Sequence, residues 1–318
     1  MGSKDAYKPI ETELLDVQKK ISEQFQDSDE QISSVLHVLS AQQGKMLRPA
    51  MTLLCGKQFS TISPEHINLA AVVELLHIAS LLHDDVIDKA QLRRGRPSAN
   101  ALWGNTAAVL LGDFLLSRAF MLAAASNCEN TAVLLSQAAQ GLCIGELKQN
   151  LLKGRFDLTE QDYFQITEAK TAGLFRCSCL FGAVVSNAPK DQQEALARFG
   201  TQLGLAFQIA DDLRDILSNE KREGKTLGTD FLQEKLTLPV IHWINQDESQ
   251  KQSRIEEVSA LKDPDSLTEK MQISGSIDYA FKEAGLRIEQ AKQSLECLSF
   301  GPIKDALSLL ADEVIDLS

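Results

Sequence analysis

The sequence contains no strand pattern, no paired cysteines and no excess of positive charge. It has no run of alternating Val, Ile and Thr between turn residues, which argues against folds built mainly on β-sheets. Its six cysteines are scattered without a CxxC pair, which argues against zinc and is typical of reduced thiols in the cytoplasm. A formal net charge of −12 over 318 residues argues against nucleic acid or anionic lipid as a partner, because the protein's field repels phosphate.

Targeting and membrane signals are also lacking. The N-terminal "MGSKDAYKPIE" has no apolar core, so we expect no secretory signal. The longest apolar stretch, residues 69–82, is too short to span a bilayer and carries Glu74 and His77. We therefore expect a soluble, cytoplasmic protein.

Helix signals dominate the sequence. Residues 132–152, 195–217 and 276–298 are rich in Ala and Leu or place apolar residues at three- and four-residue steps. No low-complexity linker divides the chain. The sequence predicts one all-α domain over residues 1–318, with about ten helices.

The pattern Asp-Asp-x-x-Asp occurs twice, each time at the end of an apolar helical run. The copies are "DDVID", with Asp84, Asp85 and Asp88, and "DDLRD", with Asp211, Asp212 and Asp215. The first and last aspartates of each copy share a helix face, and like charges there destabilise an isolated helix. A divalent cation would neutralise them, and Mg²⁺ typically takes few carboxylates plus substrate phosphates. Either copy alone would also suit an acidic helix end facing solvent.

Basic residues stand close to these motifs in the sequence. They are Lys45 and Arg48 in "GKMLRP", Arg93 and Arg94 in "RRGRP", Lys170 before Thr171, and Lys225 in a Gly-flanked loop. Each alone would suit a solvated surface cation. Arg suits bidentate phosphate recognition and Lys acts as a point charge. Together with the aspartates they favour a Mg²⁺-bridged diphosphate, and two basic sets favour two diphosphates.

Five motifs occur in order between residues 44 and 239. They are "GKMLRP", "DDVID" with "RRGRP", "KT" at 170–171, "FQIADDLRD", and "GKTLGTD" with "LTLP". In order and approximate spacing they resemble those of the trans-isoprenyl (polyprenyl) diphosphate synthases. This resemblance implies an isoprenoid-synthase-type helical bundle around a central cavity, usually a homodimer. It also implies head-to-tail joining of an allylic diphosphate to isopentenyl diphosphate with Mg²⁺ as cofactor.

The resemblance implies roles for single residues. The metal set would be Asp84, Asp88, Asp211, Asp212 and Asp215, with direct ligation by Asp84, Asp88 and Asp211 and support from Asp85, Asp212 and Asp215. The allylic diphosphate would be held by Arg93, Lys170 and Lys225. The diphosphate of isopentenyl diphosphate would be held by Lys45, Arg48, His77 and Arg94. Thr171 and Gln208 would lie near the reacting carbons. The catalytic set would be Asp84, Asp85, Asp88, Lys170, Asp211 and Lys225.

Product length is predicted from the helix face below the first motif. Ser80 and Ala79, four and five residues before Asp84, are small, and Leu76 is not aromatic. Short-product members of this family place aromatic side chains at this level as a floor. We therefore expect an open tunnel and a product of about six to eight isoprene units. Close helix packing is the alternative reason for small residues here.

Several other interpretations remain open. A geranylgeranyl diphosphate synthase, or the catalytic subunit of a heteromeric synthase, would carry the same motifs. A terpene cyclase would usually carry an Asn/Asp-Ser/Thr-Glu motif in place of the second aspartate cluster. A non-catalytic partner subunit would be expected to lose aspartates, and a helical scaffold would bind no diphosphate. Release of a long product would allow a transient membrane contact. Two departures from the family pattern are the missing Gly before Lys235 and the presence of Arg214 inside "DDLRD".

Overall fold

The computed structural model describes residues 4–26, 29–40, 44–93, 95–217, 235–260 and 264–315. These residues form sixteen α-helices, the short helices η1 and η2, and one two-stranded ribbon. In chain order the elements are α1 (Lys4–Tyr7), η1 (Lys8–Ile10), α2 (Glu11–Gln24), α3 (Glu30–Ser40), α4 (Leu47–Lys57), α5 (Pro64–Ile87), β1 (Leu92–Arg93), β2 (Arg96–Pro97), α6 (Ala99–Trp103), α7 (Asn105–Ala124), α8 (Thr131–Leu151), α9 (Glu160–Thr167), η2 (Glu168–Ala172), α10 (Gly173–Val185), α11 (Lys190–Leu217), α14 (Leu238–Asn245), α15 (Lys251–Ala260), α16 (Pro264–Ile273), α17 (Ser276–Ser294) and α18 (Pro302–Val314).

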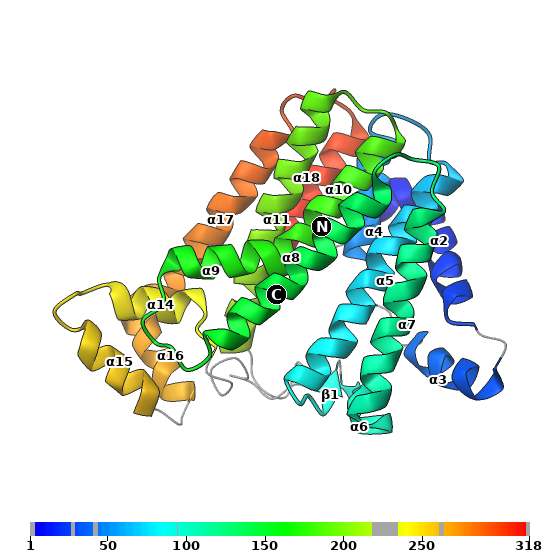
Figure 1. Ribbon diagram of the computed structural model, residues 1–318. Coiled ribbons are helices and arrows are strands. Elements are labelled where there is room, and N and C mark those ends of the chain that lie inside the picture. The colour runs from blue at the N-terminus through cyan, green and yellow to red at the C-terminus, as the bar shows by residue number, and fades with distance from the viewer. Residues whose placement is uncertain are drawn as a thin grey trace.

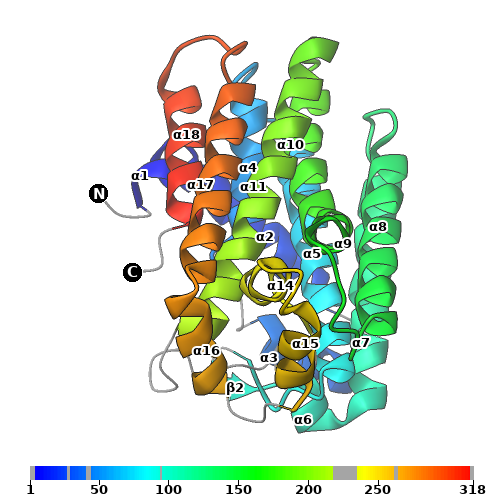
Figure 2. The same cartoon turned by 90° about the vertical axis from the view of Figure 1, so that its left-hand side faces the viewer.

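The long helices form a bundle (Figure 1). In Figure 2 helices α4, α10, α11, α17 and α18 run nearly parallel, and α14, α15 and α16 gather towards one end. Helix α4 lies inside, with every residue from Arg48 to Gly56 buried. Helix α10 packs against α4 and α11 and contributes the fully buried Phe175 and Phe181. Removal of this apolar surface from water is the main force that holds the bundle together.

The all-α prediction is confirmed. The three stretches singled out above lie mainly in α8, α11 and α17, and residues 295–298 of the last one follow the end of α17. The expected number of about ten helices is too low, because short helices such as α1, α6 and α9 connect the long ones. The described residues also contain one strand pair that the sequence pattern did not predict. It is a hairpin in which Leu92 pairs with Pro97 and Arg93 with Arg96, and Gly95 takes a φ of +72° in its turn.

Among the described residues one helix, α7, is long and apolar enough to cross a membrane by length and composition alone. The core helices of water-soluble bundles pass the same test, and 33% of its most apolar stretch is buried inside the protein. The sequence analysis considered residues 69–82 instead, and these lie in α5.

Helix α5 ends in a Schellman motif that fixes the first aspartate cluster. Lys89 takes the left-handed conformation with a φ of +52°. The N–H of Ala90 donates to the carbonyl of Asp85 at 2.9 Å, and the N–H of Lys89 donates to that of Val86 at 3.3 Å. The chain then turns into the hairpin, where the Ser98 hydroxyl donates to the carbonyl of Ala90 at 2.7 Å. The carbonyls of Asp85 and Val86 near the end of α5 are therefore satisfied within the chain.

Candidate active site

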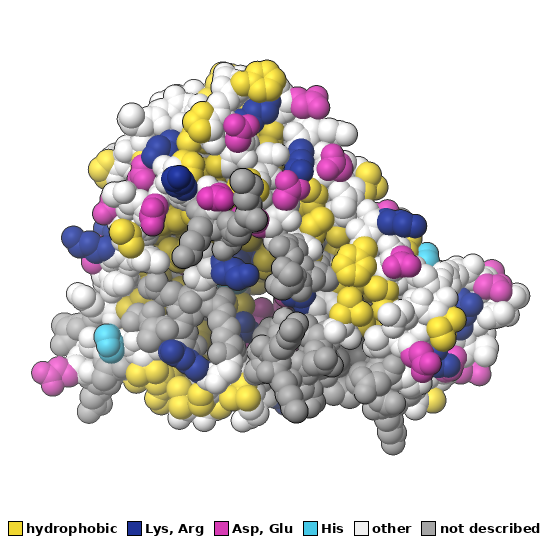
Figure 3. Space-filling model, turned by 180° about the vertical axis from the view of Figure 1, so that it is seen from behind, with side chains coloured by type: hydrophobic (Ala, Val, Ile, Leu, Met, Phe, Trp, Pro, Cys, Tyr) yellow, Lys and Arg dark blue, Asp and Glu magenta, His cyan; other side chains and the backbone are white. Residues whose placement is uncertain are grey.

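A cavity of about 510 Å³ is lined by the C-terminal parts of α5 and α11, so it contains both aspartate motifs. Thirteen predicted site residues line it, namely Arg48, His77, Ser80, Asp84, Asp85, Asp88, Arg93, Lys170, Thr171, Gln208, Asp211, Asp212 and Asp215. In Figure 3 acidic and basic side chains are visible inside a hollow near the middle of the face shown. Six Asp side chains and six Lys or Arg side chains line the cavity among the described residues. The cavity wall therefore offers carboxylates and cations in equal number.

Five predicted site residues are not placed in this cavity. Lys45 is exposed ahead of α4. Leu76 and Ala79 are buried in the core and do not line the cavity. Arg94 and Lys225 lie outside the described residues.

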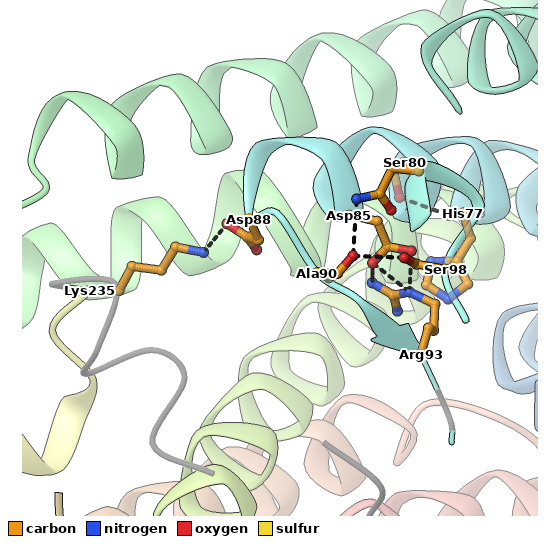
Figure 4. Close-up of polar contacts among 9 residues, drawn as sticks. His77, Ser80, Asp85, Asp88, Ala90, Arg93, Ser98 and Lys235 are labelled. Atoms are coloured by element: carbon orange, nitrogen blue, oxygen red, sulfur yellow. Dashed lines mark hydrogen bonds and ion pairs between the residues drawn. The ribbon is translucent and has the colours of Figure 1, made fainter. Parts of the chain in front are cut away.

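Asp85 and Asp88 of the first motif have different surroundings (Figure 4). Asp85 is buried and accepts two hydrogen bonds from Nε of Arg93, at 2.8 and 2.9 Å, while Nη2 of Arg93 lies 2.7 Å from its Oδ1. Asp88 accepts from Nζ of the buried Lys235 at 2.8 Å. Figure 4 shows Lys235 reaching Asp88 from the segment that leads into α14. Asp85 therefore anchors an arginine, while Asp88 is paired with a cation from a distant part of the chain.

Asp84 is partly buried at the cavity wall. Burial raises the pKa of its carboxyl to about 6, against the lowering effect of the nearby Lys170. Glu146 and Asp88 add to the rise because like charges disfavour ionisation. An ionised Asp84 is therefore costly until a further cation arrives.

The carboxylates are compatible with a metal that arrives together with its substrate. Within the described ranges, no group of three or more His, Cys, Asp or Glu side chains is close enough to hold an ion alone. The available donors are carboxylate oxygens, which hard divalent cations prefer. Mg²⁺ uses one or two carboxylates and completes its shell with water and phosphate oxygens.

The aspartates of the second motif also differ in their exposure and in their partners. Asp211 is half exposed at the cavity, with Nη1 of Arg214 at 3.7 Å from its Oδ1. Asp212 is buried and accepts hydrogen bonds from the Tyr163 hydroxyl at 2.6 Å and from Nε2 of Gln208 at 2.8 Å. Nη2 of Arg214 donates to the carbonyl of Val314 at 3.0 Å, so this arginine bridges the motif to the end of α18. Metal ligation by Asp212 stays a prediction. The metal would be a third partner of this carboxylate, beside Tyr163 and Gln208.

The basic residues are held in place by aromatic and acidic neighbours. The guanidinium of Arg48 lies 4.7 Å from the ring centre of Phe175 and 6.0 Å from that of Phe207. Burial lowers the pKa of Arg48 to about 10, and Glu74 opposes that fall. Its Nε is buried without a hydrogen-bond partner. Such a group is an available donor for an incoming anion.

Lys170 is held by residues of α8. It forms an ion pair with Glu146 and donates to Oε1 of Gln149 at 2.8 Å. Burial alone would lower its pKa, but Asp84 and Glu146 outweigh this and raise the pKa. The ammonium of Lys170 therefore remains charged beside the first motif.

Two glycines let the neighbouring helices close on η2, the π-helical segment that carries Lys170 and Thr171. A Cβ on Gly145 of α8 would lie 2.6 Å from the backbone N of Lys170. A Cβ on Gly204 of α11 would lie 2.5 Å from Cα of Ala172. Both distances are too short for a side chain, so glycine is required for this close approach. Single π turns inside α-helices occur frequently at functional sites.

Sequence reasoning did not identify several residues of this site. Lys235 stands immediately before the quoted "LTLP", but nothing in the pattern predicted its pairing with Asp88. Glu146 and Gln149 precede Lys170 by a helix and a loop, and Tyr163 lies 49 residues before its partner Asp212. Glu146 is the single acidic residue of the stretch 131–151, and this is the one signal that the sequence offered.

The fold and this cavity define a class of enzymes that bind diphosphates between two aspartate-bearing helices. The Polyprenyl synthetase family model matches residues 29–276. The chain belongs to this family and is a prenyltransferase.

Full-length relatives are consistent with that assignment. The all-trans-nonaprenyl-diphosphate synthase (geranyl-diphosphate specific) of Rhodobacter capsulatus is 36% identical over 320 residues, covering 98% of this chain and 97% of the relative. Heptaprenyl diphosphate synthase component 2 of Bacillus subtilis is 33% identical over 301 residues, covering 93% and 86%. The crystal structure of a Caulobacter crescentus polyprenyl synthase complexed with calcium and isoprenyl diphosphate matches with a TM-score of 0.90 and 32% identity, covering 99% and 97%.

Proposed function

We propose that this prenyltransferase adds isopentenyl diphosphate repeatedly, head to tail, to an allylic diphosphate and releases a long all-trans polyprenyl diphosphate. The observation that carries the proposal is the set of six aspartates and six Lys or Arg side chains that line one cavity among the described residues. The allylic diphosphate would need carboxylates to bind its metal ion. Both it and isopentenyl diphosphate would need cationic side chains to bind their phosphates. The nonaprenyl and heptaprenyl names of two relatives support a product beyond geranylgeranyl length.

The chemistry would begin with the breaking of the allylic C–O bond. Mg²⁺ bound with the diphosphate would supply Lewis-acid stabilisation of the leaving group. Asp84, Asp88 and Asp211 would hold that ion, and Lys170 and Arg93 would contact the same diphosphate. Fixed cations lower the barrier here because negative charge on the leaving group grows in the transition state.

The second substrate would then attack. Arg48 and His77 would hold the diphosphate of isopentenyl diphosphate, whose double bond attacks the allylic carbocation. The departed diphosphate would accept the proton that is lost. Apolar lining side chains, namely Leu142, Leu152, Leu158, Ile166, Leu174 and Phe207, would keep water from the carbocation.

A second groove supports a path for the growing chain. It lies between α5 and α8, has a volume of about 370 Å³, and shares Ser80, Asp84 and Leu142 with the central cavity. Its other lining residues include Leu147 and Leu151, and none of its described lining residues is Phe, Tyr or Trp. We propose that the prenyl tail passes Ser80 into this groove. Control of length by Ala79 and Leu76 stays a prediction.

Product analysis tests the function directly. The purified chain would be incubated with Mg²⁺, labelled isopentenyl diphosphate and either geranyl or farnesyl diphosphate, and the dephosphorylated products sized. Products longer than geranylgeraniol support the long-chain proposal. A product that stops at geranylgeraniol supports the geranylgeranyl alternative. Absence of product, with binding of a bisphosphonate and Mg²⁺ intact, would indicate a missing second subunit, as the name of the Bacillus relative suggests.

We further propose a homodimer formed through α7 and α8. Large apolar side chains are exposed on these two helices, namely Val109, Leu110, Met121, Val133, Ile144, Leu147 and Leu151. An apolar face of this kind marks an interaction surface. Leu110→Asp should shift the sedimentation coefficient towards the monomer. Leu15→Asp is the matched control, because Leu15 on α2 is exposed to the same degree, 61% against 62%. A monomeric wild-type chain would refute the dimer.

The cytoplasmic location and a transient membrane contact during product release remain part of the proposal. Cell fractionation in the presence and absence of substrate would test both.

A further inference from the structure

A chain of hydrogen bonds runs from α9 to the predicted reaction centre. The Tyr163 hydroxyl donates to Oδ2 of Asp212 at 2.6 Å. Nε2 of Gln208 donates to Oδ1 of the same carboxylate at 2.8 Å. The Thr171 hydroxyl donates to Oε1 of Gln208 at 2.7 Å. Three separate elements, α9, α11 and η2, thus share one polar connection.

The chemistry of the groups fixes the direction of this chain. An ionised carboxylate only accepts hydrogen bonds, so the Gln208 amide must turn its NH₂ group towards Asp212. Its oxygen then faces Thr171 and accepts from the hydroxyl. Since the only proton of that hydroxyl is used, Thr171 offers oxygen lone pairs to any other neighbour. Thr171 and Gln208 both line the cavity.

The contact between Tyr163 and Asp212 is the strong and buried end of this chain. Both side chains are buried. Hydrogen bonds from O–H to a carboxylate are short and about twice as strong as those between neutral groups. Each further bond in such a connected network is polarised by the one before it.

We propose that Tyr163 is a positioning residue, which orients Thr171 and Gln208 at the reacting carbons by holding the carboxylate of Asp212. This inference rests on the proposed function, and it adds a residue outside all of the motifs. Tyr163 also lines the cavity, but in this proposal it contacts Asp212 and touches neither the diphosphates nor the reacting atoms. Its effect travels through Asp212, so it should alter the rate of the chemical step more than substrate binding.

The test compares Tyr163→Phe with a matched variant. Tyr279→Phe also removes a hydrogen bond between a tyrosine hydroxyl and a carboxylate, and this bond also holds α9. The hydroxyl of Tyr279 on α17 donates to Oε2 of Glu160 on α9 at 2.7 Å. We expect Tyr163→Phe to lower kcat about tenfold or more, with both KM values and the Mg²⁺ dependence changed by less than about twofold. Tyr279→Phe should leave all of these within about twofold.

A double-mutant cycle provides the second readout. If Tyr163 acts through Thr171, then Tyr163→Phe should have little further effect on kcat in a Thr171→Val background. Full additivity of the two changes would overturn the proposal. An equal fall in kcat for Tyr279→Phe would overturn it as well, since docking of α9 would then explain the loss. A change confined to KM or to the Mg²⁺ dependence would assign Tyr163 to ligand binding instead.

A crystal structure of Tyr163→Phe tests the same connection without activity. We expect the Gln208 side chain to turn and its contact with Thr171 to be lost. An unchanged Asp212–Gln208–Thr171 chain would overturn the proposal. If the wild-type chain forms no prenyl product, the proposed function fails, and this structural readout still decides whether Tyr163 holds the chain in place.

Discussion

Replacing Asp84 by Asn should stabilise the metal-free protein at neutral pH. Burial raises the pKa of Asp84 from 3.8 to about 6, so the folded protein resists its ionisation. At about 1.4 kcal/mol for each pH unit between folded and unfolded pKa values, the ionised carboxylate costs up to about 3 kcal/mol. An amide of nearly the same shape carries no charge and avoids this cost.

The pH dependence follows from the direction of the shift. Above pH 6 the carboxyl is ionised in both folded and unfolded states, so the full cost is present. Below 3.8 it is protonated in both states, and the cost vanishes. The advantage of Asp84→Asn should therefore be about 3 kcal/mol at pH 7.5 and about half of that at pH 5. For a chain of this length, the larger value corresponds to about 4 °C in Tm.

Urea unfolding in EDTA at the two pH values would measure this. Asp211→Asn is the matched control, because Asp211 is half exposed in the equivalent position of the second motif and water already solvates its charge. No gain at pH 7.5, an equal gain at both pH values, or the same gain for Asp211→Asn would refute the reasoning. Asp84→Asn should also lose prenyltransfer, so that stability and activity move in opposite directions.

Three further predictions concern other parts of the site. Gly145→Ala should lower activity at least about tenfold by displacing η2. Gly285→Ala in α17 is the control, because a Cβ at that position would meet nothing within 4 Å. It should leave activity unchanged and stabilise the helix by about 1 kcal/mol. Lys235→Gln should remove the cation that pairs with Asp88, and we expect tighter binding of Mg²⁺ alone in titration calorimetry; unchanged or weaker affinity would contradict this. Ser80→Phe should shorten the product in the sizing assay by narrowing the passage between the cavity and the groove, and an unchanged product length would rule out that passage.

The fold class and the two aspartate motifs could be predicted because they depend on short-range patterns. Helical periodicity and the spacing of Asp84 and Asp88 are local properties of one helix, and α5 carries both residues into the cavity. The need for a cation to neutralise these carboxylates followed from the like charges on one helix face. The exposure of Lys45 and the absence of Ala79 from the cavity wall could not be predicted in this way.

The contacts that orient the site depend on tertiary packing. Tyr163 meets Asp212 only because α9 packs against α11, and no spacing rule joins residues 49 positions apart. Lys235 reaches Asp88 across 147 residues for the same reason. The sequence therefore identified the residues that would carry charge, and the structure identified the residues that hold them.

The π turn in η2 determines the relative rotation of the two halves of one long helix. Helices α9 and α10 continue directly into η2 on either side, so Tyr163 and Thr171 belong to one continuous rod. A π turn contains about one more residue than an α turn, and one residue corresponds to about 100° of rotation. If the same residues were wound as a regular α-helix through Glu168–Ala172, Tyr163 would lie about 100° away around the helix axis from its observed direction relative to Thr171. The π turn therefore sets the angle between Tyr163 and Thr171 around the helix axis. Tyr163 contacts the carboxylate of Asp212 directly, and Thr171 is connected to it through Gln208.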